Sequence, residues 1–334
     1  MTKFHHLQAM SAALVAAITL TACGGGSNSA STPAPTQSPP PLTTPAPATS
    51  TAVQPATTMA PTDPGAPALT NNVATDGLNW LNYRRQQAGV SVLARNSLVD
   101  SAAAGHSNYQ RLNTVTHVQE AGKPGFTGAQ LLDRLKAVGY ATPNYFYGEV
   151  ISASTTNSGV YLAEELITAI YHRFAIFEPR FKEIGAGFST SASGYTIFTN
   201  NFAANNGYGP GLGKGNIITW PVNGQTGILR NFFSDYEVPD PVDNANEVGY
   251  PISVHADADV ALTVASFSIK PRNGNDLVVK LLSAAADPEK TKTRSAVSIV
   301  PLAVLAPSTV YDVSFTGTAD GAPVSRNWSF TTKQ

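Results

Sequence analysis

The sequence has one cysteine in 334 residues, and charge of neither sign predominates. A single cysteine excludes an internal disulfide and any zinc site built from several cysteines. The 21 basic and 22 acidic residues give a net charge of -1, so we expect no nucleic-acid partner. Also absent are a Gly-x-Ser-x-Gly motif, a phosphate loop, a dinucleotide fingerprint and a His-Glu-x-x-His motif. The common hydrolase and nucleotide-binding classes therefore lack a signature here.

The lone cysteine follows a short apolar segment at the N-terminus. Residues 10–20 are mostly apolar and about half as long as the ~20 residues that span a bilayer, which is typical of a cleaved export signal. Leu20-Thr21-Ala22-Cys23 resembles a bacterial lipobox. The resemblance implies that residues 1–23 are a lipoprotein signal peptide and that Cys23 carries a lipid anchor to the membrane. No aspartate follows Cys23, so in a Gram-negative cell the resemblance would imply the outer membrane, and we expect an exported lipoprotein at the outer membrane or cell surface.

Residues 24–71 have the composition of a disordered linker. They hold 11 of the 24 prolines, mixed with Ser, Thr, Ala and Gly, and Asp63 is their only charged residue. Such a segment buries too little apolar surface to offset the entropy lost on folding. We therefore predict an extended tether between the anchor and the folded part of the chain.

Residues 72–206 predict an α+β domain of helices and a small antiparallel sheet. Apolar periodicity and capping residues predict four helices: one capped by Asp76 and ending near Gly89, one starting at Asn96 or Ser97, one with a capping box at Thr127 and Gln130 and ending at Gly139, and one from about Ser158 through Phe174. Alternating residues in 184–188 and 195–202 predict a hairpin.

The polar side chains of this domain that can carry chemistry are His106, His117, Glu149, Glu164, Glu165 and His172. His117, Glu149 and His172 belong to three separate elements and can converge only through tertiary folding. Spacing alone therefore leaves a shared site open.

Several of these residues fall within a set of short motifs in a fixed order. The motifs are Asn82-x-x-Arg85, Ala104-Gly105-His106-Ser107, His117, Gly148-Glu149 and His172-Arg173. Together they resemble the CAP superfamily, also called SCP-like or PR-1-like proteins, over about residues 74–206. The resemblance implies an α-β-α sandwich with a groove lined by two histidines and two acidic residues. It places His117, Glu149 and His172 in that groove.

The second acidic residue of the groove is not evident. Glu165 precedes His172 by seven residues on one predicted helix, which is about 10.5 Å along the axis, so the two do not readily share a metal ion. We expect Glu164 and Glu165 to be solvated or helix-start charges, and His106 to be a core histidine. Glu165 and His106 remain weaker candidates for the groove.

A metal is one of two possibilities that the sequence leaves open for the histidines. Two imidazoles and a carboxylate suit a divalent cation such as zinc. The other possibility is a buried, hydrogen-bonded network. The family resemblance implies that no metal is required for folding, so we expect no obligatory cofactor.

Residues 207–334 predict an all-β domain. Turn dipeptides at Asn223-Gly224, Asn273-Gly274 and Asp320-Gly321 separate short runs rich in Val, Ile, Thr and Ser. The predicted strands are residues 252–254, 261–269, 277–282, 296–300, 310–315 and 328–332. The closing residues resemble the end of a bacterial Ig-like domain, which implies a β-sandwich with a spacing or adhesive role.

The sequence thus predicts an exported, lipid-anchored protein with a CAP-like and an Ig-like domain. We expect a non-enzymatic surface module that binds a small apolar or amphipathic ligand, such as a lipid or sterol-like molecule, or a glycan in the CAP groove. One alternative is a zinc-assisted hydrolase that uses the groove histidines and glutamate. Another is a structural adhesin that acts through the Ig-like domain.

Overall fold

The computed structural model describes residues 63–140 and 143–334. The predicted signal peptide, Cys23 and most of the predicted tether lie outside the described residues. Those that are described belong to one compact unit. Within them, no helix is both long enough and apolar enough to cross a membrane.

Helix α1 (Val73–Ala88) begins earlier than predicted. Its N-cap is Asn72, whose side chain accepts a hydrogen bond from the backbone N–H of Thr75 at 2.9 Å. Asp76, the predicted cap, instead accepts hydrogen bonds from the backbone N–H and the hydroxyl of Thr70, both at 2.7 Å. The last residues of the predicted tether are therefore bonded to the first turn of this helix.

A four-stranded sheet forms the centre of the N-terminal part. Its strand order is β1 (Ala94–Arg95), β3 (Glu183–Thr190), β4 (Thr196–Ala204) and β2 (Phe146–Ser154). The predicted β3–β4 hairpin is confirmed. Strand β2 was not predicted, because the residues of Phe146–Ser154 do not alternate between apolar and polar. The mixed helix and sheet content that the sequence predicts is thus present.

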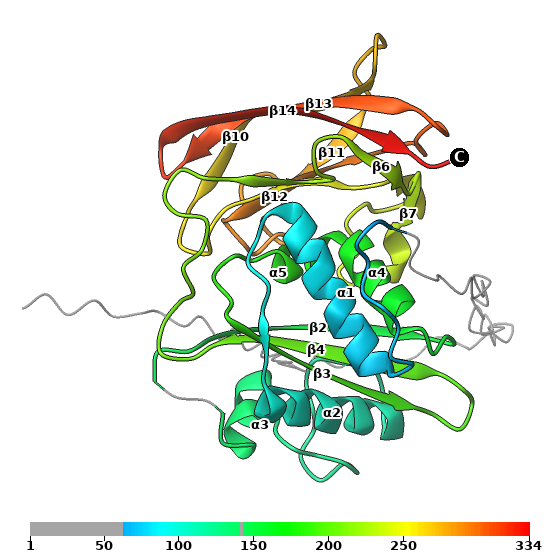
Figure 1. Cartoon of the computed structure of the whole chain (residues 1–334), viewed down its shortest axis with the longest axis vertical. Coiled ribbons are helices and arrows are strands. Elements are labelled where there is room, and N and C mark those ends of the chain that lie inside the picture. The colour runs from blue at the N-terminus through cyan, green and yellow to red at the C-terminus, as the bar shows by residue number, and fades with distance from the viewer. Residues whose placement is uncertain (1–62, 141–142) are drawn as a thin grey trace, which may run out of the picture. The chain divides into compact units, whose positions relative to one another are not determined.

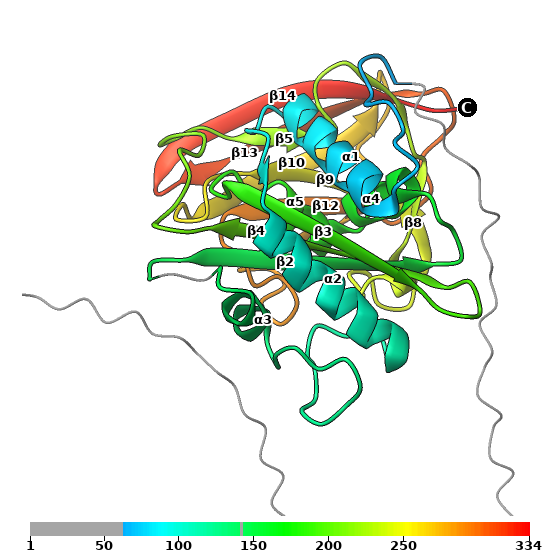
Figure 2. The same cartoon turned by 60° about the horizontal axis from the view of Figure 1, so that its bottom comes forward.

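Helices cover both faces of this sheet (Figures 1 and 2). One face carries α2 (Ser97–Leu112) and α3 (Leu131–Ala137), and the other carries α1, α4 (Gly159–Thr168) and α5 (Ile170–Ile176). Helix α2 lies directly on β3, because a Cβ added at Gly185 or Gly187 would lie 2.2 Å from the α2 backbone. Glycine at these two positions allows the close approach.

Local capping residues explain which predicted helix ends are right. Asn96 caps α2 and Ser158 caps α4, as predicted. The predicted start of α3 at Thr127 is wrong. Its cap is Gln130, because the backbone N–H of Thr127 is taken by the side chain of Gln119 at 2.7 Å. The predicted fourth helix is also wrong in its length, because Ala169 has an extended ψ of 118° and separates α4 from α5.

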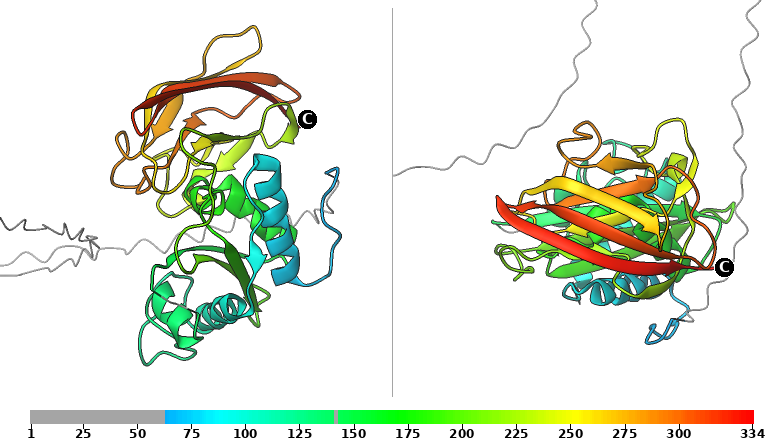
Figure 3. Two further views of the ribbon diagram at one scale, coloured as in Figure 1. Left: turned by 60° about the vertical axis from the view of Figure 1, so that its left-hand side comes forward. Right: turned by 90° about the horizontal axis from the view of Figure 1, so that it is seen from above.

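The C-terminal part contains two four-stranded sheets (Figure 3). One has the order β11-β12-β9-β5 and the other the order β10-β13-β14-β6. Their strands are β5 (Ile218–Trp220), β6 (Gln225–Ile228), β9 (Ile252–His255), β10 (Leu262–Pro271), β11 (Val279–Leu282), β12 (Ala296–Pro301), β13 (Val310–Ala319) and β14 (Ala322–Thr332). All pairs are antiparallel except β14 with β6.

All six strands predicted in this part are present, and Asp320-Gly321 forms the two-residue turn of the β13–β14 hairpin with φ values of 50° and 80°. Strands β5 and β6 were not predicted. Nor was a separate pair, β7 (Asn231–Phe233) with β8 (Glu247–Gly249), which precedes β9 in the chain.

The helical part and the C-terminal sheets share one apolar core. A single cluster of buried side chains includes Leu81 and Phe177 from the helices together with Trp220 and Phe315 from the sheets. Arg173 of α5 is fully buried and donates to the backbone carbonyl of Pro251 at 2.7 Å. The junction is therefore packed like the interior of a domain.

Candidate functional site

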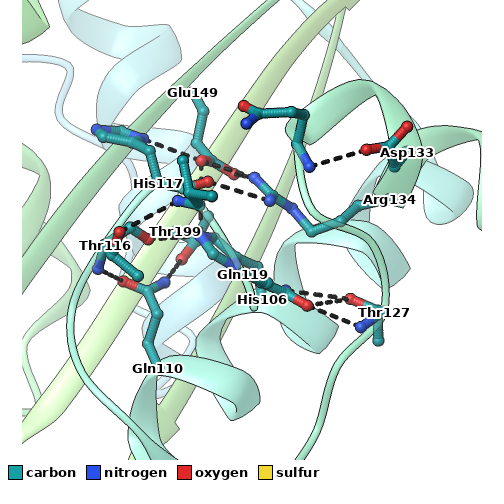
Figure 4. Close-up of polar contacts among 12 residues, drawn as sticks. His106, Gln110, Thr116, His117, Gln119, Thr127, Asp133, Arg134, Glu149 and Thr199 are labelled. Atoms are coloured by element: carbon teal, nitrogen blue, oxygen red, sulfur yellow. Dashed lines mark hydrogen bonds and ion pairs between the residues drawn. The ribbon is translucent and has the colours of Figure 1, made fainter. Parts of the chain in front are cut away.

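The side chain of Glu149 is the centre of a buried polar cluster (Figure 4). Arg134 of α3 donates to both carboxylate oxygens, at 2.9 and 2.8 Å. The Nδ1 atom of His117 lies 3.0 Å from Oε1. The side chain of Arg134 is 0% exposed and that of Glu149 5%, whereas that of His117 is 56% exposed. The cluster thus presents one imidazole to solvent and buries the groups that hold it.

These contacts fix the charge of the carboxylate. Burial by itself would raise the pKa of Glu149, but the hydrogen bond from His117 and the charge of Arg134 outweigh it and lower the pKa below the usual value. Because a carboxylate only accepts, its partner nitrogen, Nδ1 of His117, carries the proton in this assignment. In the neutral ring the Nε2 atom is then an acceptor.

His106 lies behind this pair in the core, as the sequence suggested. Its Nε2 atom is 2.8 Å from the carbonyl oxygen of Thr116, and its Nδ1 atom is 2.8 Å from the side-chain nitrogen of Gln119. Burial lowers its pKa to about 4, so the ring is neutral at pH 7. Its Nε2 atom is also 3.6 Å from Glu149. His106 therefore supports the loop that carries His117 and is not itself presented to solvent.

Arg134 and Gln119 are site residues that the sequence did not reveal. Arg134 also donates to the carbonyl oxygen of His117 at 3.1 Å, so one guanidinium holds both the loop and the carboxylate. In the sequence it is one of two basic residues in the last turn of α3, a pattern typical of solvated side chains. No local signal distinguishes it from Lys136.

Exposed apolar side chains accompany the imidazole. Tyr147 and Glu149 are two residues apart in β2 and so lie on one face of the strand. Tyr145, which is 41% exposed, stacks on Tyr147 with ring centroids 5.4 Å apart. In the loop, Val115 and Val118 on either side of His117 are also exposed. The polar centre is thus bordered by aromatic and aliphatic surface.

The structure places His172 in a different environment. Its Nδ1 atom is 3.0 Å from Oε1 of Glu237, which lies in the segment between β7 and β8. Glu237 is 1% exposed and also accepts hydrogen bonds from the backbone N–H groups of Ile170, Tyr171 and His172, at 2.7, 2.6 and 3.2 Å. In the described part of the chain, no hydrogen bond or ion pair joins His172 to His117 or Glu149.

The two glutamates of α4 differ from the prediction. Glu164 is not solvated, because it accepts hydrogen bonds from Trp80 Nε1 at 2.6 Å and from Arg84 Nε at 2.9 Å. Glu165 is half-buried, and burial together with the neighbouring Glu164 raises its pKa to about 7. Since the helix breaks at Ala169, Glu165 and His172 are not on one continuous helix, and the predicted axial separation does not apply.

The residues proposed as metal ligands do not fit a shared zinc centre. Arg134 occupies both oxygens of Glu149, and a buried guanidinium beside the carboxylate repels a second cation. His172 is bonded to Glu237 instead. Across residues 63–140 and 143–334, no group of three or more His, Cys, Asp or Glu side chains is placed to hold a metal ion.

Comparison with known proteins agrees with the motif order. Residues 78–202 match the model of the CAP family, described as the cysteine-rich secretory protein family. This range includes His106, His117, Arg134, Glu149 and His172. A search of curated proteins gives no match.

Two solved structures are similar to part of the chain. One is an extracellular protein containing an SCP domain from Bacillus anthracis, with 23% identity and a TM-score of 0.33; the match covers 39% of this chain and 39% of that one. The other is an outer surface protein from Borrelia burgdorferi, with 14% identity and a TM-score of 0.32, covering 38% of this chain and 87% of that one. The match thus spans about two fifths of the Bacillus protein's length.

Proposed function

We propose that this chain is an exported surface module that binds a small amphipathic ligand at the His117–Glu149 site, within the residues 78–202 that match the CAP family model. The observation that carries the proposal is the exposed imidazole of His117, held by a buried carboxylate and bordered by exposed apolar side chains. Binding sites for small molecules are mostly apolar and use a few fixed polar groups to orient the ligand.

The polar and the apolar parts of the site would contact different parts of the ligand. A hydroxyl of the ligand head would donate to Nε2 of His117, whose ring is held in place by Glu149 and Arg134. The apolar part would contact the stacked rings of Tyr145 and Tyr147. A lipid or a sterol-like molecule has this chemistry. A glycan is the second candidate, because sugar rings also stack on exposed tyrosines.

The rest of the chain would place this site at the cell surface. Lipidation of Cys23 and an extended tether would anchor the folded part to the outer membrane. For the C-terminal part we infer an Ig-like domain that acts as a spacer or an adhesive module. The strand orders β5-β9-β12-β11 and β6-β14-β13-β10 support this, since they correspond to the A-B-E-D and A′-G-F-C sheets of immunoglobulin folds.

Ligand analysis of the full chain tests the proposal. Organic extraction of protein purified from its host, followed by mass spectrometry, is expected to release one lipid-like molecule per chain in addition to the anchor. With a fluorescent fatty acid as the probe, Tyr145→Ala and His117→Ala are expected to weaken binding about tenfold, equivalent to ~1.4 kcal/mol. Tyr236→Ala removes an exposed tyrosine of the C-terminal part and is the matched control. Wild-type binding by both site variants would rule out this site.

The same preparation distinguishes the zinc alternative. We expect dialysis against excess zinc to leave the melting temperature unchanged, because Arg134 occupies the carboxylate. Stoichiometric zinc that is lost in His117→Ala and in His172→Ala would instead favour the metal-assisted hydrolase.

A further inference from the structure

A second surface with the features of a binding site lies on the C-terminal part, away from the CAP domain's residues. The outer face of β10, β13 and β14, seen from above in the right-hand view of Figure 3, carries an open hollow of about 460 Å³. The polar residues that line it are Asn223, Ser268, Lys270, Arg272, Asp312, Ser314, Asn327 and Ser329. No residue of the His117–Glu149 site contributes to it.

Strand register arranges these side chains in two rows across the sheet. One row is Ser268, Ser314 and Asn327, and the other is Lys270, Asp312 and Ser329. Neighbouring members of a row are on adjacent strands, which lie about 4.8 Å apart. The hollow therefore offers a regular set of hydroxyl, amide and charged groups at short spacing.

Most of these groups are free to bind a ligand. In the described part of the chain, the side chains of Ser268, Ser314 and Asn327 make no hydrogen bonds. The neighbouring rows of the same face differ, because Ser266 pairs with Thr316 and Thr263 with Thr318, each at 2.7 Å. Hydrogen-bonding capacity is thus satisfied within the sheet beside the hollow and left open inside it.

The charges of the hollow are not balanced. Arg272 and Asp312 form an ion pair at 2.7 Å, whereas Lys270 forms no ion pair in the described residues. Val313 and Trp328 also line the hollow, but both are buried, and Trp328 packs against Phe267 in the core. The hollow therefore has two positive side chains and one negative side chain, which give it a net charge of +1, and no exposed apolar side chain.

We propose that this face binds an acidic polysaccharide, a chain of sugars that carry carboxylates. Sugar hydroxyls both donate and accept, as the Ser and Asn side chains of the hollow do. A carboxylate complements the net positive charge of the hollow and can accept a hydrogen bond from the Lys270 ammonium. A lipid or an apolar peptide side chain would leave the hydroxyl and amide groups of the hollow without partners. This site goes beyond the ligand site of the CAP domain and does not depend on it.

Binding of the full chain to polygalacturonate, with alginate as a second acidic probe, tests the proposal. Fully methyl-esterified polygalacturonate has the same backbone without the carboxylate charges and is the uncharged control ligand. We expect Lys270→Gln to weaken binding to the acidic polymers about tenfold, because a hydrogen bond to a charged group contributes ~1.5 kcal/mol or more. Asn327→Ala is expected to weaken it several-fold, and added salt to weaken the wild type.

Control variants separate this site from the rest of the molecule. Lys333→Gln removes another exposed lysine, and Ser325→Ala changes an exposed residue of β14 outside the hollow; both are expected to bind like the wild type. Equal binding of the charged and esterified polymers would overturn the acidic ligand. Unchanged binding by Lys270→Gln and Asn327→Ala, or no binding to either acidic polymer, would overturn the site.

Discussion

At the scale of single residues, the site depends on one carboxylate with several partners. The family resemblance predicted His117, Glu149 and His172 in one groove. The structure places the side chains of His117 and Glu149 3.0 Å apart, whereas His172 is bonded to Glu237. Arg134 and Gln119 complete the cluster, but their contacts come from tertiary packing of α3 and the preceding loop. A sequence pattern predicts which face of a helix is buried. It does not predict which distant carbonyl or carboxylate accepts a hydrogen bond from a polar side chain.

Burial of His106 predicts acid sensitivity. Its pKa falls from 6.5 to about 4 on folding, so the folded state binds this proton less tightly than the unfolded chain does. The stability contributed by the neutral ring is complete above pH 6.5 and is lost as the pH falls towards 4. The loss begins near pH 6.5, where the unfolded chain takes up the proton. Between pH 7 and pH 5 the unfolding free energy therefore falls by roughly 2 kcal/mol, at ~1.4 kcal/mol per pH unit below 6.5.

Urea unfolding of the wild type and of His106→Gln at pH 7 and pH 5 isolates this contribution. The variant lacks the titrating ring, so its change in unfolding free energy between the two pH values is expected to be smaller. Other groups oppose the trend, since burial raises the pKa of Glu178 to about 7, but they are common to both proteins. Ring resonances of His106 that titrate near pH 6.5 would contradict the prediction.

At the scale of elements, local signals predicted two of the four helix starts, those of α2 and α4, and missed the starts of α1 and α3. The caps Asn96 and Ser158 bond within their own first turns, so the sequence contains what is needed to predict them. The break at Ala169 has no such signal, because alanine favours a helix. The first N–H groups of α5 are bound by Glu237, which lies 67 residues from Ile170 in the chain. A residue that far along the chain is not visible to a periodicity argument.

Glu237 is therefore expected to be essential for α5. Replacing it by alanine leaves the N–H groups of Ile170, Tyr171 and His172 and the ring of His172 without this partner, and each buried unsatisfied group costs about 1–3 kcal/mol. We expect Glu237→Ala to lower the unfolding free energy by about 3 kcal/mol or more, with faster amide hydrogen exchange at residues 170–172. Glu247→Ala is the control, because Glu247 is exposed and bonded only to Asn231. Equal stability of the two variants would contradict this role.

At the scale of the whole molecule, the junction between the helical part and the C-terminal sheets has no counterpart in the sequence pattern. The change in composition near residue 206 predicts two domains, and the position of that boundary stays a prediction. In the structure, buried side chains of both parts form one cluster, and Glu178 of the helical part accepts a hydrogen bond from the backbone N–H of Ala258 at 3.0 Å. Contacts between distant segments cannot be read from local composition.

A shared core of this kind predicts that both parts unfold together. Arg173 is fully buried, lies 4.9 Å over the ring of Tyr250 and donates to the carbonyl of Pro251, so it links α5 to the C-terminal sheets. Calorimetry is expected to give one transition whose van't Hoff and calorimetric enthalpies agree. Arg173→Met leaves buried carbonyls unpaired. It is expected to lower the unfolding free energy by about 3 kcal/mol and thereby the midpoint temperature of that single transition. Arg111→Met, at an exposed arginine bonded only to Asn108, is expected to shift it by less than ~0.5 kcal/mol. Two separate transitions, with only one sensitive to Arg173→Met, would show instead that the helical part and the C-terminal sheets fold independently.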